Sequence, residues 1–570
     1  MTKIRSALSS IPVAAWLMYA FLGWFIVAFL IYPNLNVYYE IFWGGGSFSL
    51  DAVHKLISSE RAMKSLYNSF ILALSLVVTV NLVGIFLVLV TEYFEIKGAK
   101  ILRLGYFTTL VYSGVVLVSG YKFIYGDSGF ITRVLSHLFP AFNVNWFHGY
   151  GAVLFVMTFA CTSNHVIFLT NAIRKLDFQT VEAAKNMGAS TFYILRRVVL
   201  PVLKPTIFAL TVLLFLTGLG ATSAPLILGG SEFQTITPMI LTFARSVTSK
   251  DLAALLALVL GVATLLLLTL MIRFEKNGNF MSVSKVKSAL VKQKINNRIG
   301  NVLVHTAAYL LFVIYIIPVV LIILFSFTDA RSISTAMLSP GEFTLDNYIT
   351  VFSNMSAFKP YLVSICYAAV ASLAVVVLTL MASRILHKFN NIWSRTLEYA
   401  LLIPWMLPST LIAIGLIVTF DTPKPILGNT VLLGTLWLLL IAYVIVHIPF
   451  TLRMVKASFF SIDGNLEDAA KNLGARSFYS FRRVLLPIIL PSALAVLALN
   501  FNNILADYDL TVFLYHPLYQ PLGIVIKNST DAQALADTQA LTLVYSVILM
   551  IMSAITLYGV YGRSSRSKTK

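Results

Sequence analysis

The sequence predicts an all-α integral membrane protein with about twelve transmembrane helices, arranged as two tandem halves of six. Three observations predict this fold class. The chain is 58% hydrophobic and only 11% charged, which excludes a soluble globular protein. Apolar runs long enough to cross about 30 Å of hydrocarbon recur along the chain. One polar stretch is also repeated at an interval close to half of the 570 residues.

The apolar runs divide evenly between residues 1–273 and residues 301–570. Gly, Pro or charged residues bound each run. The predicted spans are 11–33, 65–91, 104–124, 149–172, 205–229, 251–272, 302–328, 360–382, 396–420, 430–452, 491–515 and 538–561. The first run lacks a small-residue cleavage site, so we expect it to be retained as an anchor rather than removed as a signal peptide.

The formal charge of +19 follows the membrane topology, so it does not indicate nucleic-acid binding. If the N-terminus is cytosolic, the segments on that side carry most of the 42 Lys and Arg residues. We therefore expect both termini on the cytosolic side of a bacterial cytoplasmic (inner) membrane. Cys161 and Cys366 fall within predicted spans, where burial is expected rather than a disulfide or a metal site.

The repeated stretch shows that the chain contains the same unit twice. Glu182–Pro201 reads "EAAKNMGASTFYILRRVVLP", and Asp468–Pro487, 286 residues later, reads "DAAKNLGARSFYSFRRVLLP". Thirteen of the twenty positions are identical. Each half therefore holds six spans in the same order and orientation. Residues 274–300 are predicted to form a basic cytosolic linker between the halves, which could lie on anionic lipid headgroups.

The local residues of this stretch predict a helix, a turn and a second helix. Asp177 is a good N-cap, Ala183 and Ala184 leave a smooth helix face, and Gly188 suits the left-handed position that ends a helix. Glu182 lies near the positive helix N-terminus, where its carboxylate can pair with a cation of a partner. The matching residues of the second copy are Asp463, Asp468, Ala469, Ala470 and Gly474.

These two stretches resemble the EAA loops of type I, binding-protein-dependent ABC importer permeases, which have the MetI-like fold. The pattern is matched by Glu182, Ala183, Ala184, Gly188, Leu200 and Pro201 and by Asp468, Ala469, Ala470, Gly474, Leu486 and Pro487, with Asp replacing the first Glu. The resemblance implies that the loops 177–205 and 463–491 dock two copies of a cytosolic ATPase subunit, and that an extracytoplasmic binding protein delivers the substrate.

The ATPase itself is expected in a separate chain. The sequence contains no GxxxxGK[ST] phosphate-binding loop. We therefore expect a transport subunit that is not an enzyme, has no catalytic residues and binds no cofactor, while the partner ATPase binds ATP and Mg.

Fused permease halves are typical, within the family that the loops resemble, of systems for ferric iron, thiamine and phosphonates. The segment Leu505–Ile526 resembles the ferric-iron permeases most closely. Ferric iron is therefore the expected substrate, and thiamine, phosphonate or another small solute is the alternative.

The eleventh span is polar where its counterpart is not. It carries Asn500, Asn502, Asn503, Asp507 and Asp509, and the equivalent positions of the fifth span are Leu214, Leu216, Thr217, Ala221 and Ser223. Because a carboxylate near mid-membrane costs at least about 2.5 kcal/mol, such acids usually face a polar interior. Asn503, Asp507 and Asp509 are therefore candidates for the substrate path.

The two acids lie on different helix faces, so both can face one passage only if the helix breaks there. The alternative is that they lie at the external mouth, cap a helix or bond an Asn. His516 is expected to be a loop histidine rather than a metal ligand.

Two other function classes remain open from the residues alone. Twelve spans in two parallel halves also describe a proton-coupled secondary transporter, although the loop "EYFEIKGAK" lacks the Gly/Asp/Arg pattern of that class. A membrane enzyme that uses the two acids is the other possibility, but no supporting cluster of His or Ser accompanies them.

Overall fold

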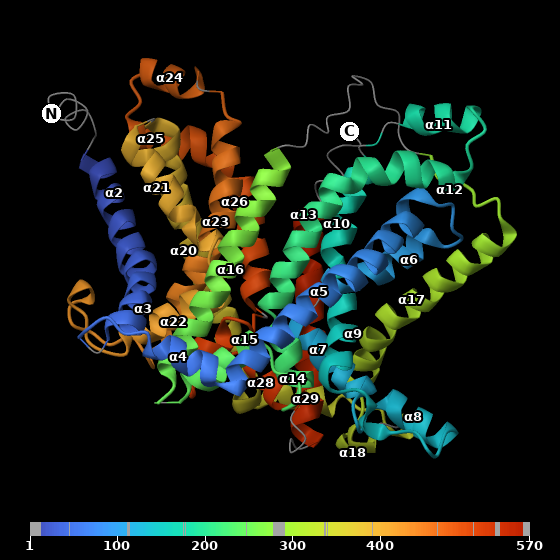
Figure 1. Cartoon of the computed structure of the whole chain (residues 1–570). Coiled ribbons are helices and arrows are strands. Elements are labelled where there is room, and N and C mark those ends of the chain that lie inside the picture. The colour runs from blue at the N-terminus through green and yellow to red at the C-terminus, as the bar shows by residue number, and fades with distance from the viewer. Residues whose placement is uncertain are drawn as a thin grey trace.

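The computed structural model describes residues 13–562 except 45, 111–113, 175, 177, 247, 277–290, 336–337, 339, 390, 464, 506 and 531–535. Within these residues the chain is helical, apart from four isolated β-bridges, so the predicted fold class is confirmed (Figure 1).

The part of the chain before the linker contains both long and short α-helices. They are α2 (Val13–Ile26), α3 (Tyr32–Trp43), α4 (Asp51–Ser58), α5 (Glu60–Val88), α6 (Ala99–Tyr106), α7 (Gly114–Tyr125), α8 (Phe130–Leu138), α9 (Gly149–Ala160), α10 (Thr162–Ile173), α11 (Phe178–Asn186), α12 (Thr191–Ile194), α13 (Leu200–Leu219), α14 (Ser223–Leu228), α15 (Ile236–Ala244) and α16 (Lys250–Lys276).

The α-helices after the linker repeat this order. They are α17 (Arg298–Ser326), α18 (Ala330–Thr335), α19 (Asp346–Ser353), α20 (Met355–Lys388), α21 (Ile392–Leu402), α22 (Ser409–Phe420), α23 (Leu436–Phe460), α24 (Asn465–Asn472), α25 (Ser477–Ser480), α26 (Leu486–Leu505), α27 (Thr511–Leu514), α28 (Leu522–Asn528) and α29 (Ala536–Leu557).

Ten described helices are long and apolar enough to cross a membrane, and the count rises to twelve if two bent helix pairs are each one span. The bent pairs replace the third predicted span of each half, 104–124 and 396–420. They turn by 106° between residues 109 and 114 and by 102° between residues 405 and 409. In the second pair, Pro404 and Pro408 flank the turn, and proline cannot continue the helical hydrogen bonds.

The predicted fifth and eleventh spans also end early. They were expected to continue to residues 229 and 515, but α13 ends at Leu219 and α26 ends at Leu505. Near the first break, Gly218 packs against the Cα atom of Ala73, and an added Cβ would come within 2.5 Å of it. Each long helix is followed by a short one, α14 or α27, so the two halves share a broken segment at the same place.

The two halves interlock through their first helices. α3 packs on α22 of the second half, and α17 packs on α6 and α7 of the first half. The side chains of Phe312 and Ile322 on α17 lie where a Cβ at Gly105 and Gly120 would come within 2.3 and 2.5 Å. The Tyr106 hydroxyl donates to the Ala308 carbonyl at 2.8 Å. Neither half therefore has a complete set of helix neighbours without the other.

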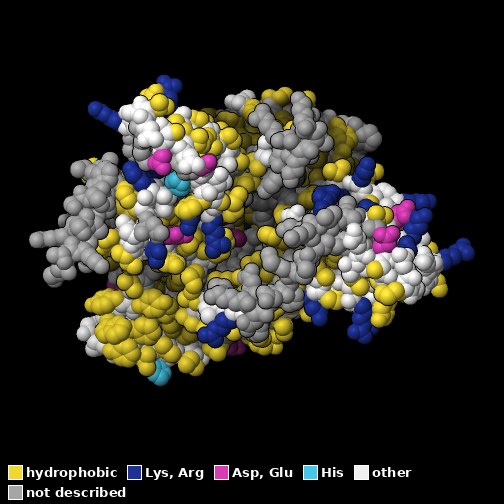
Figure 2. Space-filling model, turned by 90° about the horizontal axis from the view of Figure 1, so that it is seen from above, with side chains coloured by type: hydrophobic (Ala, Val, Ile, Leu, Met, Phe, Trp, Pro, Cys, Tyr) yellow, Lys and Arg dark blue, Asp and Glu magenta, His cyan; other side chains and the backbone are white. Residues whose placement is uncertain are grey.

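The molecule has two distinct faces (Figure 1). The face that carries α11 and α24 is called the upper face here, and the face that carries α8 and α18 is called the lower face. Figure 2 looks onto the upper face, where Lys and Arg side chains gather toward both ends of the molecule.

Candidate functional site

The first candidate region is α11 and the turn that follows it. α11 runs through Ala183 and Ala184 as predicted, and Gly188 has a φ of +84°. The backbone N–H of Ala189 donates to the Ala184 carbonyl at 3.1 Å, which closes the helix C-terminus. Asp177, the predicted cap, lies outside the described residues.

The second copy has the same geometry. α24 runs through Ala469 and Ala470, and Gly474 has a φ of +83°. Asp463 Oδ1 accepts from the Asn465 N–H at 3.0 Å, as expected of a cap. Nothing lies within 4 Å of a Cβ built at Gly188 or Gly474, so backbone conformation alone calls for glycine at these turns.

Both loops expose large apolar side chains at matching positions. Met187 and Leu473 are 82% and 89% exposed, and Phe192 and Phe478 are 72% and 75% exposed. Glu182 and Asp468 are exposed on α11 and α24. Met187 and Leu473 lie outside the candidate membrane spans, whereas Phe192 and Phe478 lie in the first residues of the spans Thr191–Leu219 and Phe478–Leu505. The two loops thus carry matched apolar surfaces, which makes them candidates for contact with a protein partner.

The two helices are attached to the bundle in different ways. Val181 on α11 is fully buried and belongs to the same apolar cluster as Leu89. At the corresponding positions the second half has Glu467 and Arg384, which form a two-pronged ion pair with distances of 2.7 and 2.8 Å. The side chains of this pair are only 10% and 11% exposed. Sequence reasoning missed this pair, although the change from Val before Glu182 to Glu before Asp468 could have indicated it.

A cavity of about 430 Å³ lies between the halves, beside the two breaks that end α13 and α26. Most of its walls come from α7, α9, α13, α14 and α16 of the first half. The second half contributes the start of α22 and Asp509. Asp509 is the only charged side chain that lines this cavity among the described residues.

Asp509 and Ser223 occupy equivalent positions of the two repeats, and the structure brings them together. The backbone N–H of Ser223 donates to the Asp509 carboxylate. Both residues line the cavity. Because equivalent positions of the two repeats are in contact here, the cavity lies at the boundary between the two halves.

Three of the six hydroxyls that line this cavity can present only lone pairs to it. Three threonine hydroxyls donate their protons to carbonyls of their own segments: Thr217 to Leu213, Thr222 to Gly220 and Thr264 to Leu260. Their oxygens can therefore only accept further bonds. The Thr410 hydroxyl is buried, lines the same cavity and has no partner in the described structure. The cavity is thus rich in acceptors and suited to a cation or a hydrogen-bond donor. These hydroxyls come from separate helices, and no spacing in the sequence could have grouped them.

The structure separates the other predicted path residues from this cavity. The Asp507 carboxylate accepts from the Leu510 N–H at 3.3 Å, from the Thr511 N–H at 3.1 Å and from the Thr511 hydroxyl at 3.0 Å. It therefore caps α27, which was the alternative expected for these acids. Asn503 is exposed on α26 and does not line the cavity.

Two further polar residues have structural roles. The Asn500 side chain donates to the Thr451 hydroxyl at 2.7 Å and so joins α26 to α23. The His516 ring accepts from the Leu518 N–H at 3.1 Å within a short turn, so His516 is a loop histidine, as expected.

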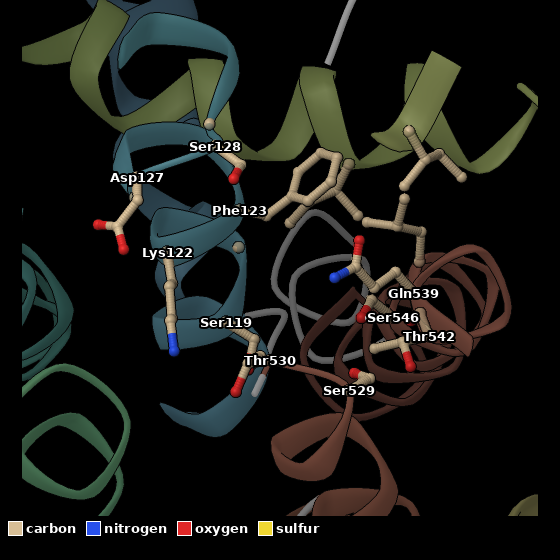
Figure 3. Close-up of a pocket in the computed structure, with 16 residues that line it drawn as sticks. Ser119, Lys122, Phe123, Asp127, Ser128, Ser529, Thr530, Gln539, Thr542 and Ser546 are labelled. Carbon is tan, nitrogen blue, oxygen red and sulfur yellow. Dashed lines mark hydrogen bonds between the residues drawn. The ribbon is translucent and has the colours of Figure 1, made fainter. Parts of the chain in front are cut away.

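A second cavity, of about 330 Å³, opens at the lower face between α7 of the first half and α17, α18 and α29 of the second. Figure 3 shows Phe123 and Gln539 pointing into it from opposite sides, whereas Asp127 points away. The hydroxyls of Thr542 and Ser546 donate to carbonyls of their own helix, and Ser119 Oγ has no partner in the described residues. Both halves therefore line this cavity, with hydroxyls, the Gln539 amide and Lys122 among apolar side chains.

Comparison with known families identifies the repeated unit. Residues 4–277 and 376–566 match the family model described as "Binding-protein-dependent transport system inner membrane component". The two matches correspond to the two halves of the bundle.

Individual relatives are similar along most of the chain. A probable ABC transporter permease protein of Sinorhizobium fredii is 40% identical over 94% of this chain and 94% of its own length. A putative ferric transport system permease protein of Haemophilus influenzae is 21% identical over 86% of this chain and 76% of its own. A putative 2-aminoethylphosphonate transport system permease protein of Salmonella paratyphi A is 26% identical, over 43% of this chain and 89% of its own.

Proposed function

Because the chain belongs to the binding-protein-dependent transport system inner membrane components, we propose that it forms the membrane passage of an ATP-driven importer and that α11 and α24 each dock one ATPase subunit. In this proposal one chain binds two ATPase subunits, which bind ATP and Mg, and an extracytoplasmic binding protein delivers the solute. The permease itself binds no cofactor.

The matched apolar surfaces of the two loops carry this proposal. Met187 and Leu473 are more than four-fifths exposed outside the spans, and burying one such side chain contributes about 1.5–3 kcal/mol. Each ATPase subunit gains this free energy when it covers one loop. Glu182 and Asp468 add a charge that a basic side chain of the partner can meet.

The proposed orientation places the upper face in the cytosol. This face carries the two docking loops, and Lys and Arg gather on it (Figure 2). Basic residues near span ends are retained on the cytosolic side. Both termini are then cytosolic, and the lower cavity faces the binding protein.

We propose ferric iron as the solute. A hard trivalent cation prefers oxygen ligands, and the cavity between the halves offers the Asp509 carboxylate together with threonine oxygens that can only accept. A phosphonate carries negative charge, and no basic side chain lines this cavity among the described residues. The relatives named for ferric transport also extend over both halves of the chain, whereas the phosphonate relative extends over less than half.

Native mass spectrometry of the complex, purified with its ATPase and binding protein, tests the docking sites. We expect one permease chain with two ATPases, and only one ATPase after either Met187→Asp or Leu473→Asp. Leu138→Asp makes the same change at an exposed residue of the lower face and serves as the control. Two bound ATPases in the double variant Met187→Asp, Leu473→Asp would contradict this assignment. Two permease chains in the wild-type complex would also contradict it.

Metal analysis of the purified binding protein tests the substrate. Bound iron is the expected result. A binding protein loaded with thiamine, a phosphonate or another small solute would reject ferric iron and leave the docking proposal unaffected.

A further inference from the structure

The chain between the halves is tied to the first docking loop just before it enters α17. Residues 291–297, called the strap here, follow the part of the linker that lies outside the described residues. Gln293 forms a parallel β-bridge with Phe94, in the loop between α5 and α6. Its N–H donates to the Tyr93 carbonyl at 2.8 Å, and its carbonyl accepts from the Glu95 N–H at 3.0 Å. The strap is therefore held to a loop of the first half by one isolated β-bridge and two backbone hydrogen bonds.

Side chains fasten the strap further. Lys292 Nζ donates to the Thr91 carbonyl at 2.7 Å. Burial lowers the pKa of Lys292, and the nearby Arg103 and Arg174 add to this effect while Glu92 opposes it. Gln293 is buried, and its side-chain amide donates to the Val291 carbonyl at 2.7 Å. Glu92 lies among these cations and forms ion pairs with Arg103 and Arg174, at 3.4 and 2.9 Å.

One residue joins the strap to the docking loop. Thr191 opens α12, three residues after the turn at Gly188. Its hydroxyl donates to the Lys294 carbonyl at 3.1 Å. Its carbonyl accepts from the Tyr93 hydroxyl at 3.4 Å. The segment that follows α11 is thus bonded both to the strap and to the loop that the strap pairs with.

The other end of the strap continues directly into the second half. Asn297 caps α17 through bonds from its Oδ1 to the N–H groups of Ile299 and Gly300, at 3.0 and 3.4 Å. α17 packs on α6, α7 and α29. Its Ile322 also lines the lower cavity. Three residues, 295–297, lie between Lys294 and the start of α17.

We propose that the strap is a mechanical tie that carries movement of the first docking loop to α17, and so to the wall between the two halves. This inference rests on the proposed function, since the movement comes from an ATPase docked on α11. The short path through Thr191, Lys294 and Asn297 gives that ATPase a direct connection to a helix of the opposite half. A two-state movement of the loop must then bias the position of α17.

The test uses the purified complex in lipid vesicles and measures how strongly the iron-loaded binding protein stimulates ATP hydrolysis. Thr191→Val removes the hydroxyl bond to Lys294, and Gln293→Pro removes the N–H that pairs with Tyr93. We expect each change to lower the stimulation by about threefold to tenfold, as the loss of one hydrogen bond from a two-state element predicts. Both ATPase subunits are expected to remain bound.

Matched variants keep the strap intact. Thr191→Ser retains the hydroxyl, and Gln293→Ala retains the backbone bonds, so both are expected to match the wild type. A protease site placed within residues 277–290 cuts the linker ahead of the strap, and cleavage is expected to leave the stimulation unchanged. Hydrogen exchange provides a measurement that is independent of transport, because the Glu95 amide, which donates to the residue 293 carbonyl, should lose protection in Gln293→Pro.

Wild-type stimulation in both Thr191→Val and Gln293→Pro would overturn the tie. Equal loss in Thr191→Ser and Thr191→Val would also overturn it, because the hydroxyl bond would then be irrelevant. A wild-type chain that binds no ATPase at all would instead reject the proposed function on which the inference rests.

Discussion

At the scale of single residues, two neighbouring acids of one helix break have separate roles. Asp507 satisfies the first N–H groups of α27, whereas Asp509 faces the cavity and meets Ser223 of the opposite half. Because α26 ends at Leu505 and α27 begins at Thr511, both acids lie in the short segment between the two helices, where Asp507 can bond the start of α27.

We therefore predict different defects for the two acids. Asp509→Asn keeps size and hydrogen bonding but removes the charge, so iron uptake should fall about tenfold or more, equivalent to about 1.4 kcal/mol, with unchanged thermal unfolding. Asp507→Ala removes a cap and should cost about 0.5–2 kcal/mol of stability. Uptake in vesicles and thermal unfolding in detergent separate the two effects. Full uptake by Asp509→Asn would show that the carboxylate is not part of the passage.

Gly188 and Gly474 have positive φ values in open space, so substitutions there act through the backbone alone. A residue with a Cβ in this conformation costs roughly 1–2 kcal/mol, and a β-branched residue costs more. We predict that Gly188→Val and Gly474→Val abolish uptake and leave membrane insertion intact, while Gly188→Asn is tolerated. Membrane insertion is measured as the amount of protein in the membrane fraction. Normal uptake in both Val variants would show that the turns serve only as topological spacers.

At the scale of helices, the two docking segments are alike in shape and different in attachment. α11 is held by apolar packing of Val181, whereas α24 is held by the buried pair of Glu467 and Arg384. Breaking a buried pair leaves one charge without compensation, but replacing both partners with apolar residues often costs little.

This difference predicts a double-mutant result. Arg384→Leu alone, or Glu467→Val alone, should destabilise the second half by about 3–5 kcal/mol and weaken binding of one ATPase. The double variant reproduces the residues of the first half and should recover most of the loss. Thermal unfolding and ATPase copy number of the four proteins measure the coupling. Additive losses in the double variant would show that the pair does not act as a unit.

The sequence predicts helices well where a local signal marks them. The Ala pairs and the glycines of the repeated loops predict α11 and α24 and their turns, and the structure confirms both geometries. The breaks after Leu219 and Leu505 were not predicted, because apolar residues continue past them and hydropathy does not distinguish a continuous span from a broken one. Asp509 was found from the comparison of the repeats, whereas its threonine neighbours come together only through tertiary packing.

At the scale of the whole molecule, each half packs its first helix against the other half: α3 lies on α22, and α17 lies on α6 and α7. This exchange of first helices makes the two halves depend on each other. The repeat predicts two halves but not this exchange, because both halves carry the same pattern and no local signal identifies the partner of a helix. The glycine gaps that receive Phe312 and Ile322 become recognisable only once α17 lies on α6 and α7.

The exchange predicts that residues 1–276 and 291–570 assemble when they are produced as separate chains. Each half supplies a helix to the other, so the two chains should co-purify and migrate as one species in size-exclusion chromatography. Either chain alone should aggregate or be degraded. A monodisperse, stable 1–276 fragment would show that the contribution of α17 to the first half is dispensable.

The same exchange imposes a delay during synthesis, because α3 is made long before α22, the helix that it packs on. The Thr419 hydroxyl on α22 donates to the carbonyl of Pro33 on α3, across 386 residues of chain. At roughly 5–20 residues per second, the ribosome needs about 20 to 80 s to make the partner of a helix that has already left it. For that interval the side of α3 that packs on α22 has only lipid, the translocation machinery or a chaperone to cover it, so biogenesis of this protein depends on protecting that surface until nearly three quarters of the chain has been translated.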